Sequence, residues 1–289
     1  MNNPIVLHVN YVEQGQSIPE MCDLAVAWGY DGIEFRRKRG GVEESSEEYL
    51  DAIAGAREKS GLRMVLFGGP GPDLMNPDAE TREREVEECL AFYKLAAERF
   101  DLTVCNTTTG SLTAEEIPYY HFDKHGSAIA TEEHWEWAAE GFQRLGDCAS
   151  DLGFRFAFET HNCYLHDLPK PTLELLKKID RRNVGVNFDY GNILIHPDGG
   201  SLSDAIRTLA DHIYEVHLKN VWMLPGQRYF NFIPCGLGDG AINNREFLRE
   251  LKAIGYTGPL AIEAPRQGDR EHYAKQDIAY LRQLMAEVG

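Results

Sequence analysis

Short apolar runs of strand length alternate along the chain with longer segments of helical periodicity. Eight runs qualify as strands, because most are rich in β-branched or aromatic residues: 5–9, 32–35, 63–67, 102–106, 154–159, 184–189, 213–218 and 259–264. Strict alternation of strands and helices is typical of a parallel sheet, and eight units suggest closure into a barrel. The sequence therefore predicts the α/β class, with a single (β/α)8 barrel domain over residues 1–289.

The segments between these runs carry apolar residues at helical spacing. In 81–100, residues Val86, Leu90, Tyr93 and Ala97 recur at spacings of three and four opposite a charged face. The expected helices are 17–28, 46–60, 81–100, 131–153, 170–179, 201–210, 243–255 and 270–287.

An open doubly wound sheet is the competing fold, but it normally carries a glycine-rich phosphate loop after its first strand. Here the first strand is followed by "NYVEQGQS", which has no such loop. Two connections, 107–130 and 220–242, are longer than the others and bear aromatic residues. Both follow strands, so we expect them to act as binding loops or lids at the carboxyl face of the barrel.

The formal net charge of −17 argues against binding to nucleic acid or to an anionic membrane surface. No run approaches the ~20 apolar residues of a membrane span, and the first residues lack the pattern of a secretory signal. The six cysteines are scattered singly, as is typical of free thiols in a reducing compartment. We expect a cytoplasmic protein.

Ionisable residues follow the apolar runs at the same end of several predicted strands. The last four strands end in or carry Glu159, Asp189, His217 and Glu263. Residues two apart on a strand share a face, so in 154–159 the phenylalanines should face the helices while Ala157 and Glu159 face the barrel interior. Three carboxylates and one imidazole would then converge at the carboxyl mouth. Such a cluster predicts one divalent cation, Mn²⁺, Mg²⁺ or Co²⁺, with Zn²⁺ as a further candidate.

Six segments occur in the order seen in the xylose isomerase-like barrel superfamily, and they span almost the whole chain. They are "GYDGIEF" (29–35), "FAFETH" (156–161), "NVGVNFD" (183–189), "EVHLKNV" (215–221), "LGDGAIN" (237–243) and "GYTGPLAIEA" (255–264). The chain most resembles the sugar isomerase/epimerase branch, which includes D-tagatose 3-epimerase and inosose-processing enzymes.

The resemblance implies that Glu159, Asp189, His217 and Glu263 hold one metal ion, most often Mn²⁺. It also implies a keto-sugar or cyclic polyol substrate, from which one glutamate removes a proton to give a cis-enediolate and the other returns it. A homo-oligomer is expected on the same ground. Residues named as substrate contacts are His8, Glu34, Arg36, Asn192, Lys219 and Arg228. Epimerases of this type often carry a histidine where Asn192 stands, and an arginine in the loop that holds Arg228.

His161 leaves a second reaction open on the same scaffold. The stretch 159–176 resembles 3-dehydroshikimate dehydratases, in which the histidine two residues after the glutamate is the general base. In that reading His161 takes the proton, and Lys219 or Arg36 and Arg37 pair with a substrate carboxylate. In the isomerase reading, His161 only orients Glu159.

Two other classes share the scaffold. Metal-dependent apurinic-site nucleases use more metal ligands and bind DNA, which the acidic charge opposes. A non-catalytic sugar-binding barrel would not need both glutamates. The aromatic groups 119–122 and 229–232 suit either a sugar pocket or a subunit contact, and we favour the pocket.

Overall fold

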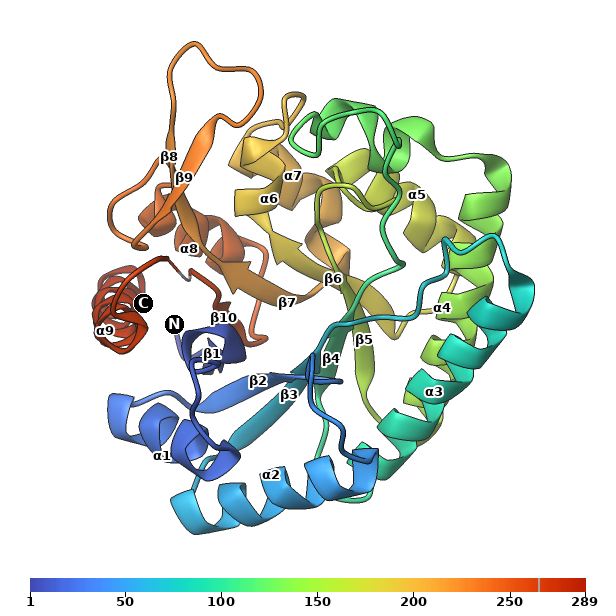
Figure 1. Cartoon of the computed structure of the whole chain (residues 1–289). Helices are drawn as coiled ribbons and strands as arrows, with labels where there is room; N and C mark the ends of the chain where they lie inside the picture. The colour runs from blue at the N-terminus through green and yellow to red at the C-terminus, as the bar shows by residue number, and fades with distance from the viewer. Residues whose placement is uncertain (265) are drawn as a thin grey trace.

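The computed structural model describes residues 1–264 and 266–289, and in them eight parallel strands form a nearly closed barrel (Figure 1). The strand order is β3–β2–β1–β10–β7–β6–β5–β4, and β3 packs beside β4 where the ring closes. This confirms the (β/α)8 barrel. The strands are β1 (Ile5–His8), β2 (Gly32–Arg36), β3 (Met64–Gly68), β4 (Val104–Thr107), β5 (Arg155–Glu159), β6 (Val184–Asp189), β7 (Ile213–Leu218) and β10 (Leu260–Ile262).

Eight helices surround the strands, close to the segments that periodicity predicts. They are α1 (Ile18–Trp28), α2 (Ser46–Ser60), α3 (Ala79–Ala97), α4 (Glu132–Leu152), α5 (Pro169–Ile179), α7 (Leu202–Leu209), α8 (Asn244–Ala253) and α9 (Arg270–Val288). Local chemistry sets several ends: Ser17 and Ser45 form capping boxes, and Gly29, Gly61 and Gly153 end their helices with positive φ. None of the described helices has the length and apolar content needed to cross a membrane.

Short elements in the connections go beyond the sequence prediction. The connection after β7 contains an antiparallel hairpin, β8 (Asn220–Met223) with β9 (Phe232–Cys235), which projects beside the barrel mouth (Figure 1). A short helix, α6 (Tyr190–Ile195), follows β6 directly. The described 3-10 turns are η1 (Val9–Tyr11), η2 (Phe122–Lys124), η3 (Gly126–Ile129) and η4 (Ala210–His212). These elements are too short to give a recognisable period.

The two faces of β5 point into different cores, as alternation predicts. Phe156 and Phe158 are buried in the large cluster between the strands and the outer helices. Ala157 belongs instead to a small cluster inside the barrel, together with Val6, Leu66, Val104 and Ala261. Glu159 shares the inward face of Ala157 and therefore stands at the top of the barrel interior.

Polar side chains fill the level of the barrel interior below the mouth, where branched apolar residues are usual. Glu34, Asn106, Asn187 and Glu215 are all buried there. Burial raises the pKa of Glu215 well above its ordinary value, and the nearby carboxylates act in the same direction. The polar character of the mouth therefore extends into the barrel itself.

Asp167 joins two loops beside the mouth. Its Oδ2 accepts a hydrogen bond of 3.0 Å from the backbone N–H of Ser127, which ties the connection after β5 to the long connection 107–130. The side chain is almost completely buried, and burial raises the pKa of Asp167 to about 7.

We expect Asp167 to make stability fall as the pH rises. Its pKa is about 7 in the folded state and about 3.8 in the unfolded chain, so the folded state binds more protons between these values. The free energy of unfolding should therefore decrease by up to about 1.4 kcal/mol per pH unit over this window. Urea unfolding of the wild type and of Asp167→Asn at several pH values should give curves that diverge by this amount. Asp151→Asn, at an exposed position of α4, is the control, and parallel wild-type and Asp167→Asn curves would refute the expectation.

Candidate metal centre and substrate cavity

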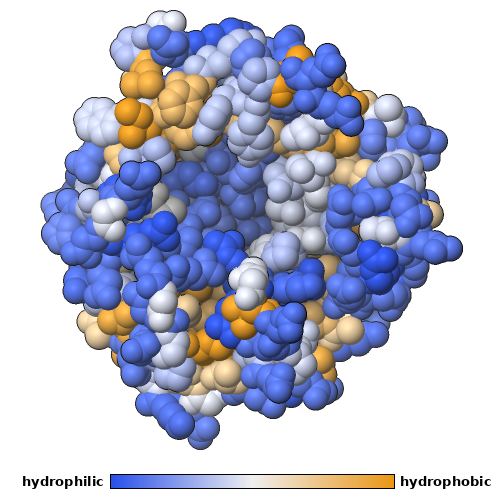
Figure 2. Space-filling model, viewed as in Figure 1, coloured by the Kyte–Doolittle hydropathy of each residue, from blue (hydrophilic) through white to orange (hydrophobic). Residues whose placement is uncertain are grey.

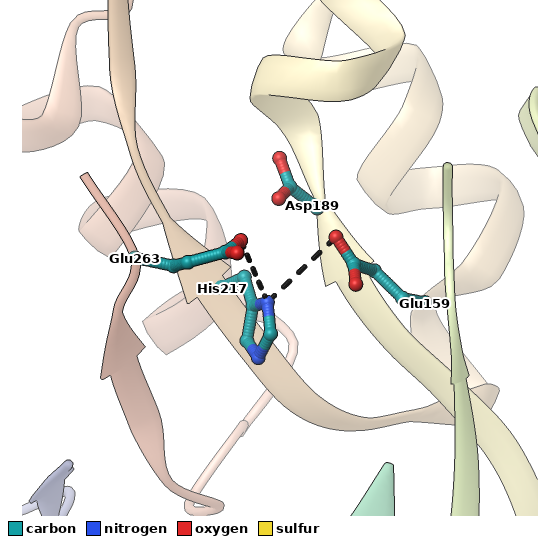
Figure 3. A group of neighbouring side chains, drawn as sticks. All are labelled: Glu159, Asp189, His217 and Glu263. Atoms are coloured by element: carbon teal, nitrogen blue, oxygen red, sulfur yellow. Dashed lines mark hydrogen bonds and ion pairs between the residues drawn. The ribbon is translucent and has the colours of Figure 1, made fainter. Parts of the chain in front are cut away.

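Four side chains converge at the carboxyl mouth of the barrel. Glu159 ends β5, Asp189 ends β6, His217 lies near the end of β7, and Glu263 directly follows β10 (Figure 3). Asp189 and His217 are direct partners in the β6–β7 register. One ligand atom from each of the four residues lies within 4.8 Å of the others. The sequence prediction named these four residues, and the fold brings them together.

His217 is held from below by Glu34. Its Nε2 lies 2.8 Å from Glu34 Oε2, and a carboxylate can only accept, so Nε2 carries the proton. Nδ1 therefore faces the mouth, 3.2 Å from Glu263 Oε2 and 3.8 Å from Glu159 Oε1 (Figure 3). A carboxylate that fixes the second nitrogen of an imidazole is the usual partner of a metal-binding histidine.

The electrostatics of this group are set by burial and by mutual charge. Burial alone would lower the pKa of His217, but Glu34, Glu159 and Glu263 raise it well above its ordinary value. Burial raises the pKa of Asp189 to about 6, with Glu159 and Glu263 adding to the effect and Lys219 opposing it. The cluster thus has too much negative charge for its own cations, and a divalent ion would relieve it by replacing the proton on Nδ1 of His217.

Lys219 supplies positive charge at the same place. Its Nζ lies 2.6 Å from Asp189 Oδ2, 2.8 Å from Glu263 Oε2 and 3.9 Å from Glu159 Oε1. Burial opposes its charge, but these carboxylates raise the pKa of Lys219 well above its ordinary value. Its stem passes Gly191, where a Cβ atom would collide with the Lys219 side chain. The glycine in "DYGN" is therefore required by packing.

The donor set fits a divalent metal ion. Ligand atoms that each lie about 2.2 Å from one ion are at most about 4.4 Å apart, close to the separations in this cluster. Three carboxylates with one imidazole suit Mn²⁺, Mg²⁺ or Co²⁺, as the sequence predicts. The carboxylates come from separate strands, so the barrel positions them before any ion binds.

Two further predicted residues contact this cluster. Asn192 Nδ2 donates to Glu159 Oε1 at 2.9 Å, and its backbone N–H donates to Asp189 Oδ1 at 3.0 Å. His8 accepts a hydrogen bond on Nδ1 from the Asn10 N–H, so its protonated Nε2 is the atom that lies 3.8 Å from Glu263 Oε1. Asn192 thus orients Glu159 of the candidate metal centre, and His8 lies beside Glu263.

His161 stands beside the cluster with a free nitrogen. Its Nδ1 lies 2.9 Å from the carbonyl oxygen of Asn162, which can only accept, so Nδ1 holds the proton. In the tautomer that this hydrogen bond selects, Nε2 carries the lone pair. Tyr164 packs against the ring at a centroid distance of 5.0 Å and helps to fix its orientation.

His166 is a supporting residue that the sequence did not identify. Its Nδ1 donates to the backbone oxygen of Glu159 at 2.5 Å, and its Nε2 accepts from the Thr109 N–H at 3.4 Å. It ties the end of β5 to the connection after β4. Glu215 was also missed, although it lies two residues before His217 and alternation places both on the inward face.

A cavity of about 310 Å³ opens beside the candidate metal centre. The hollow at the centre of Figure 2 is lined mainly by hydrophilic residues. The lining residues are Tyr119, Tyr120, Phe122, His161, Asn162, Gly191, Asn192, Ile195, Lys219, Asn220, Val221, Phe232, Pro234, Glu263 and Ala264.

Four predicted substrate contacts are not among the residues that line this cavity: His8, which lies beside Glu263, and Glu34, Arg36 and Arg228. Glu34 is fully buried beneath His217. Arg36 pairs with Glu13 at 3.0 Å, and Arg228, on the β8–β9 hairpin, pairs with Asp123 at 2.9 Å. In the described structure each of these side chains pairs with a protein carboxylate or imidazole, and their contact with substrate stays a prediction.

Curated sequence relatives include inosose dehydratases. That of Geobacillus thermodenitrificans is 26% identical over 179 residues, covering 56% of this chain and 58% of the relative. That of Salmonella typhimurium is 25% identical over 170 residues, covering 54% and 56%. The matches therefore span a little over half the length of these relatives.

Solved structures match over almost the full length. A 3-keto-D-glucoside 4-epimerase from E. coli has a TM-score of 0.76 at 15% identity, covering 97% of this chain and 99% of that one. A xylose isomerase-like barrel protein from Mycobacterium smegmatis in complex with magnesium has a TM-score of 0.79 at 19% identity, covering 99% and 98%. At these identities the likeness supports the fold.

A family model described as xylose isomerase-like TIM barrel matches residues 22–284, which is most of the chain. The match includes all four residues of the candidate metal centre. The chain belongs to the xylose isomerase-like TIM barrel family.

Proposed function

We propose that this chain is a metal-dependent dehydratase that acts on a keto-sugar or cyclic keto-polyol. The observation that carries this proposal is His161, which lines the cavity with Nδ1 protonated and Nε2 free to accept a proton. The sequence alone favoured isomerase or epimerase chemistry. The geometry of His161 and the inosose dehydratase relatives support the dehydratase alternative instead.

Glu159, Asp189, His217 and Glu263 would hold one divalent ion such as Mn²⁺ or Mg²⁺. When bound, such an ion polarises a substrate carbonyl and its neighbouring hydroxyl and so acidifies the adjacent C–H bond. Glu34 keeps Nδ1 of His217 directed at the mouth, and Lys219 offsets the charge of Asp189 and Glu263.

His161 performs the proton transfers in this scheme. Nε2 removes the proton next to the carbonyl, and the electron pair forms the enolate. As the carbonyl re-forms, the hydroxyl on the next carbon leaves and takes the proton from His161. The products are an unsaturated ketone and one water molecule, and His161 returns to its neutral form.

Epimerisation is the second candidate, and the convergence of Glu159 and Glu263 favours it. Two carboxylates on opposite sides of a substrate carbon could remove and return a proton. Glu263 lines the cavity, whereas Glu159 is held by Asn192 at 2.9 Å. A glutamate base at position 159 would need to release this hydrogen bond. The homo-oligomer and the cytoplasmic location stay predictions.

Turnover in D₂O should separate the two reactions. We expect the metal-loaded protein to convert 2-keto-myo-inositol into a product lighter by one water, which mass spectrometry detects. Epimerisation would instead give a product of the same composition with one deuterium. A deuterated epimer without loss of water would refute the dehydratase proposal.

His161→Gln should lower kcat by at least about 100-fold, because general base catalysis typically contributes that much. Metal content and the unfolding midpoint should stay at wild-type values, since His161 holds no other element of the site. His212→Gln, at a histidine on the opposite end of β7, is the matched control. Wild-type kcat in His161→Gln would assign the proton transfer to a glutamate.

Glu34→Gln should weaken binding of Mn²⁺ about 10- to 100-fold, because the residue that orients a metal-binding histidine influences affinity by this amount. Isothermal titration of the metal-free protein measures the effect. Glu44→Gln, which removes the carboxylate paired with Arg39 on the surface, should bind Mn²⁺ like the wild type. Unchanged affinity in Glu34→Gln would contradict a contribution of the Glu34 charge to metal binding, because the glutamine oxygen can still accept from His217 Nε2.

A further inference from the structure

The substrate cavity has two chemically different ends. The polar end holds His161, Asn192, Lys219 and Glu263 beside the candidate metal centre. The other end, which we term the distal subsite, is lined by Tyr119, Tyr120, Phe122, Ile195, Val221 and Phe232. Phe122, Ile195 and Val221 are buried in one apolar cluster against which Phe232 packs. The distal subsite is therefore part of a packed apolar cluster and not a set of scattered surface residues.

The distal subsite is held in shape by contacts between two loops. His121 stacks on Tyr229 with ring centroids 3.6 Å apart, and the Tyr120 and Phe230 centroids are 4.7 Å apart. Asp123 accepts from Arg228 at 2.9 Å. The connection after β4 and the β8–β9 hairpin, which projects beside the barrel mouth in Figure 1, thus form one wall.

Among the described residues, none that lines the distal subsite carries a positive charge. Among the described lining residues, Lys219 is the single lysine or arginine, and it lies at the polar end between Asp189 and Glu263. On the two loops that form the wall, Arg228 and Lys124 both pair with Asp123. A phosphate or carboxylate placed in the distal subsite would lose its water without gaining a cation, which is strongly unfavourable.

We propose that the distal subsite selects an uncharged substrate, namely a keto-polyol or keto-sugar that carries neither a phosphate nor a carboxylate at the end remote from its carbonyl. The apolar wall gains free energy by covering the C–H face of such a ligand. This inference rests on the proposed function, since it takes the carbonyl to bind beside the metal centre.

Two pairs of probes test the proposal on the full-length, Mn²⁺-loaded protein. D-fructose is compared with D-fructose 6-phosphate, and 2-keto-myo-inositol with 3-dehydroshikimate. We expect the uncharged member of each pair to bind at least about tenfold more tightly by isothermal titration, or to have a kcat/KM higher by that factor where turnover occurs. Equal or tighter binding of both charged members would overturn the proposal.

A charge introduced into the distal subsite should change this preference. Tyr120→Arg places a cation at a partly exposed lining position, and we expect it to shift the binding ratio of D-fructose 6-phosphate to D-fructose by at least about tenfold toward the phosphate. Trp222→Arg adds the same charge on the hairpin but outside the cavity lining, so it should keep the wild-type ratio. An unchanged ratio in Tyr120→Arg would also contradict the proposal.

These measurements test the selection of an uncharged substrate separately from the proposed dehydratase reaction. Absence of both dehydration and proton exchange with every probe would refute the chemistry, while the binding ratios would still test the distal subsite. Dehydration of 3-dehydroshikimate in preference to 2-keto-myo-inositol would support the chemistry and refute the selection of an uncharged substrate.

Discussion

One hydrogen bond connects the interior of the barrel to its mouth. His217 donates from Nε2 to Glu34 Oε2 at 2.8 Å, and both side chains are buried. Without this bond the buried Glu34 would keep only the hydrogen bond from Asn106 Nδ2, which is costly for a carboxylate, and the imidazole would be oriented from the mouth side alone, by Glu263. With it, Nδ1 points to the place where Glu159, Asp189 and Glu263 converge. The candidate metal centre depends on this support from below.

The net charge of the site therefore matters as much as the identity of its candidate ligand atoms. His217 and Lys219 offset part of the carboxylate charge, and the remaining excess is what a divalent cation would neutralise. His161 stands apart from this balance, because it hydrogen-bonds to a backbone oxygen and keeps Nε2 free. That difference is why the geometry supports His161 as the base. The distal subsite, with its aromatic wall, then influences which substrate can bind in the cavity.

The inward-facing residues and the four strand ends of the candidate metal centre could be predicted, because side chains along a β-strand alternate between its two faces. The alternation placed Ala157 and Glu159 on the inward face of β5 and brought four strand ends to one mouth. Contacts between loops could not be predicted in this way. The β8–β9 hairpin and α6 are too short to have a period, and His166 acts on a backbone oxygen that any residue at position 159 would provide. Arg36 and Arg228 were expected at the substrate, but they pair with Glu13 and Asp123 and do not line the cavity.

The sequence by itself determined the (β/α)8 barrel and the four residues of the candidate metal centre, because both follow from local periodicity repeated over eight units. The tertiary structure decided how the rings of His161 and His217 are turned, that Glu34 supports His217 instead of facing the cavity, and that the described residues at one end of the cavity include no cation. These properties arise from contacts between residues far apart in the chain. A local sequence pattern cannot predict such contacts, because they exist only once the barrel has closed.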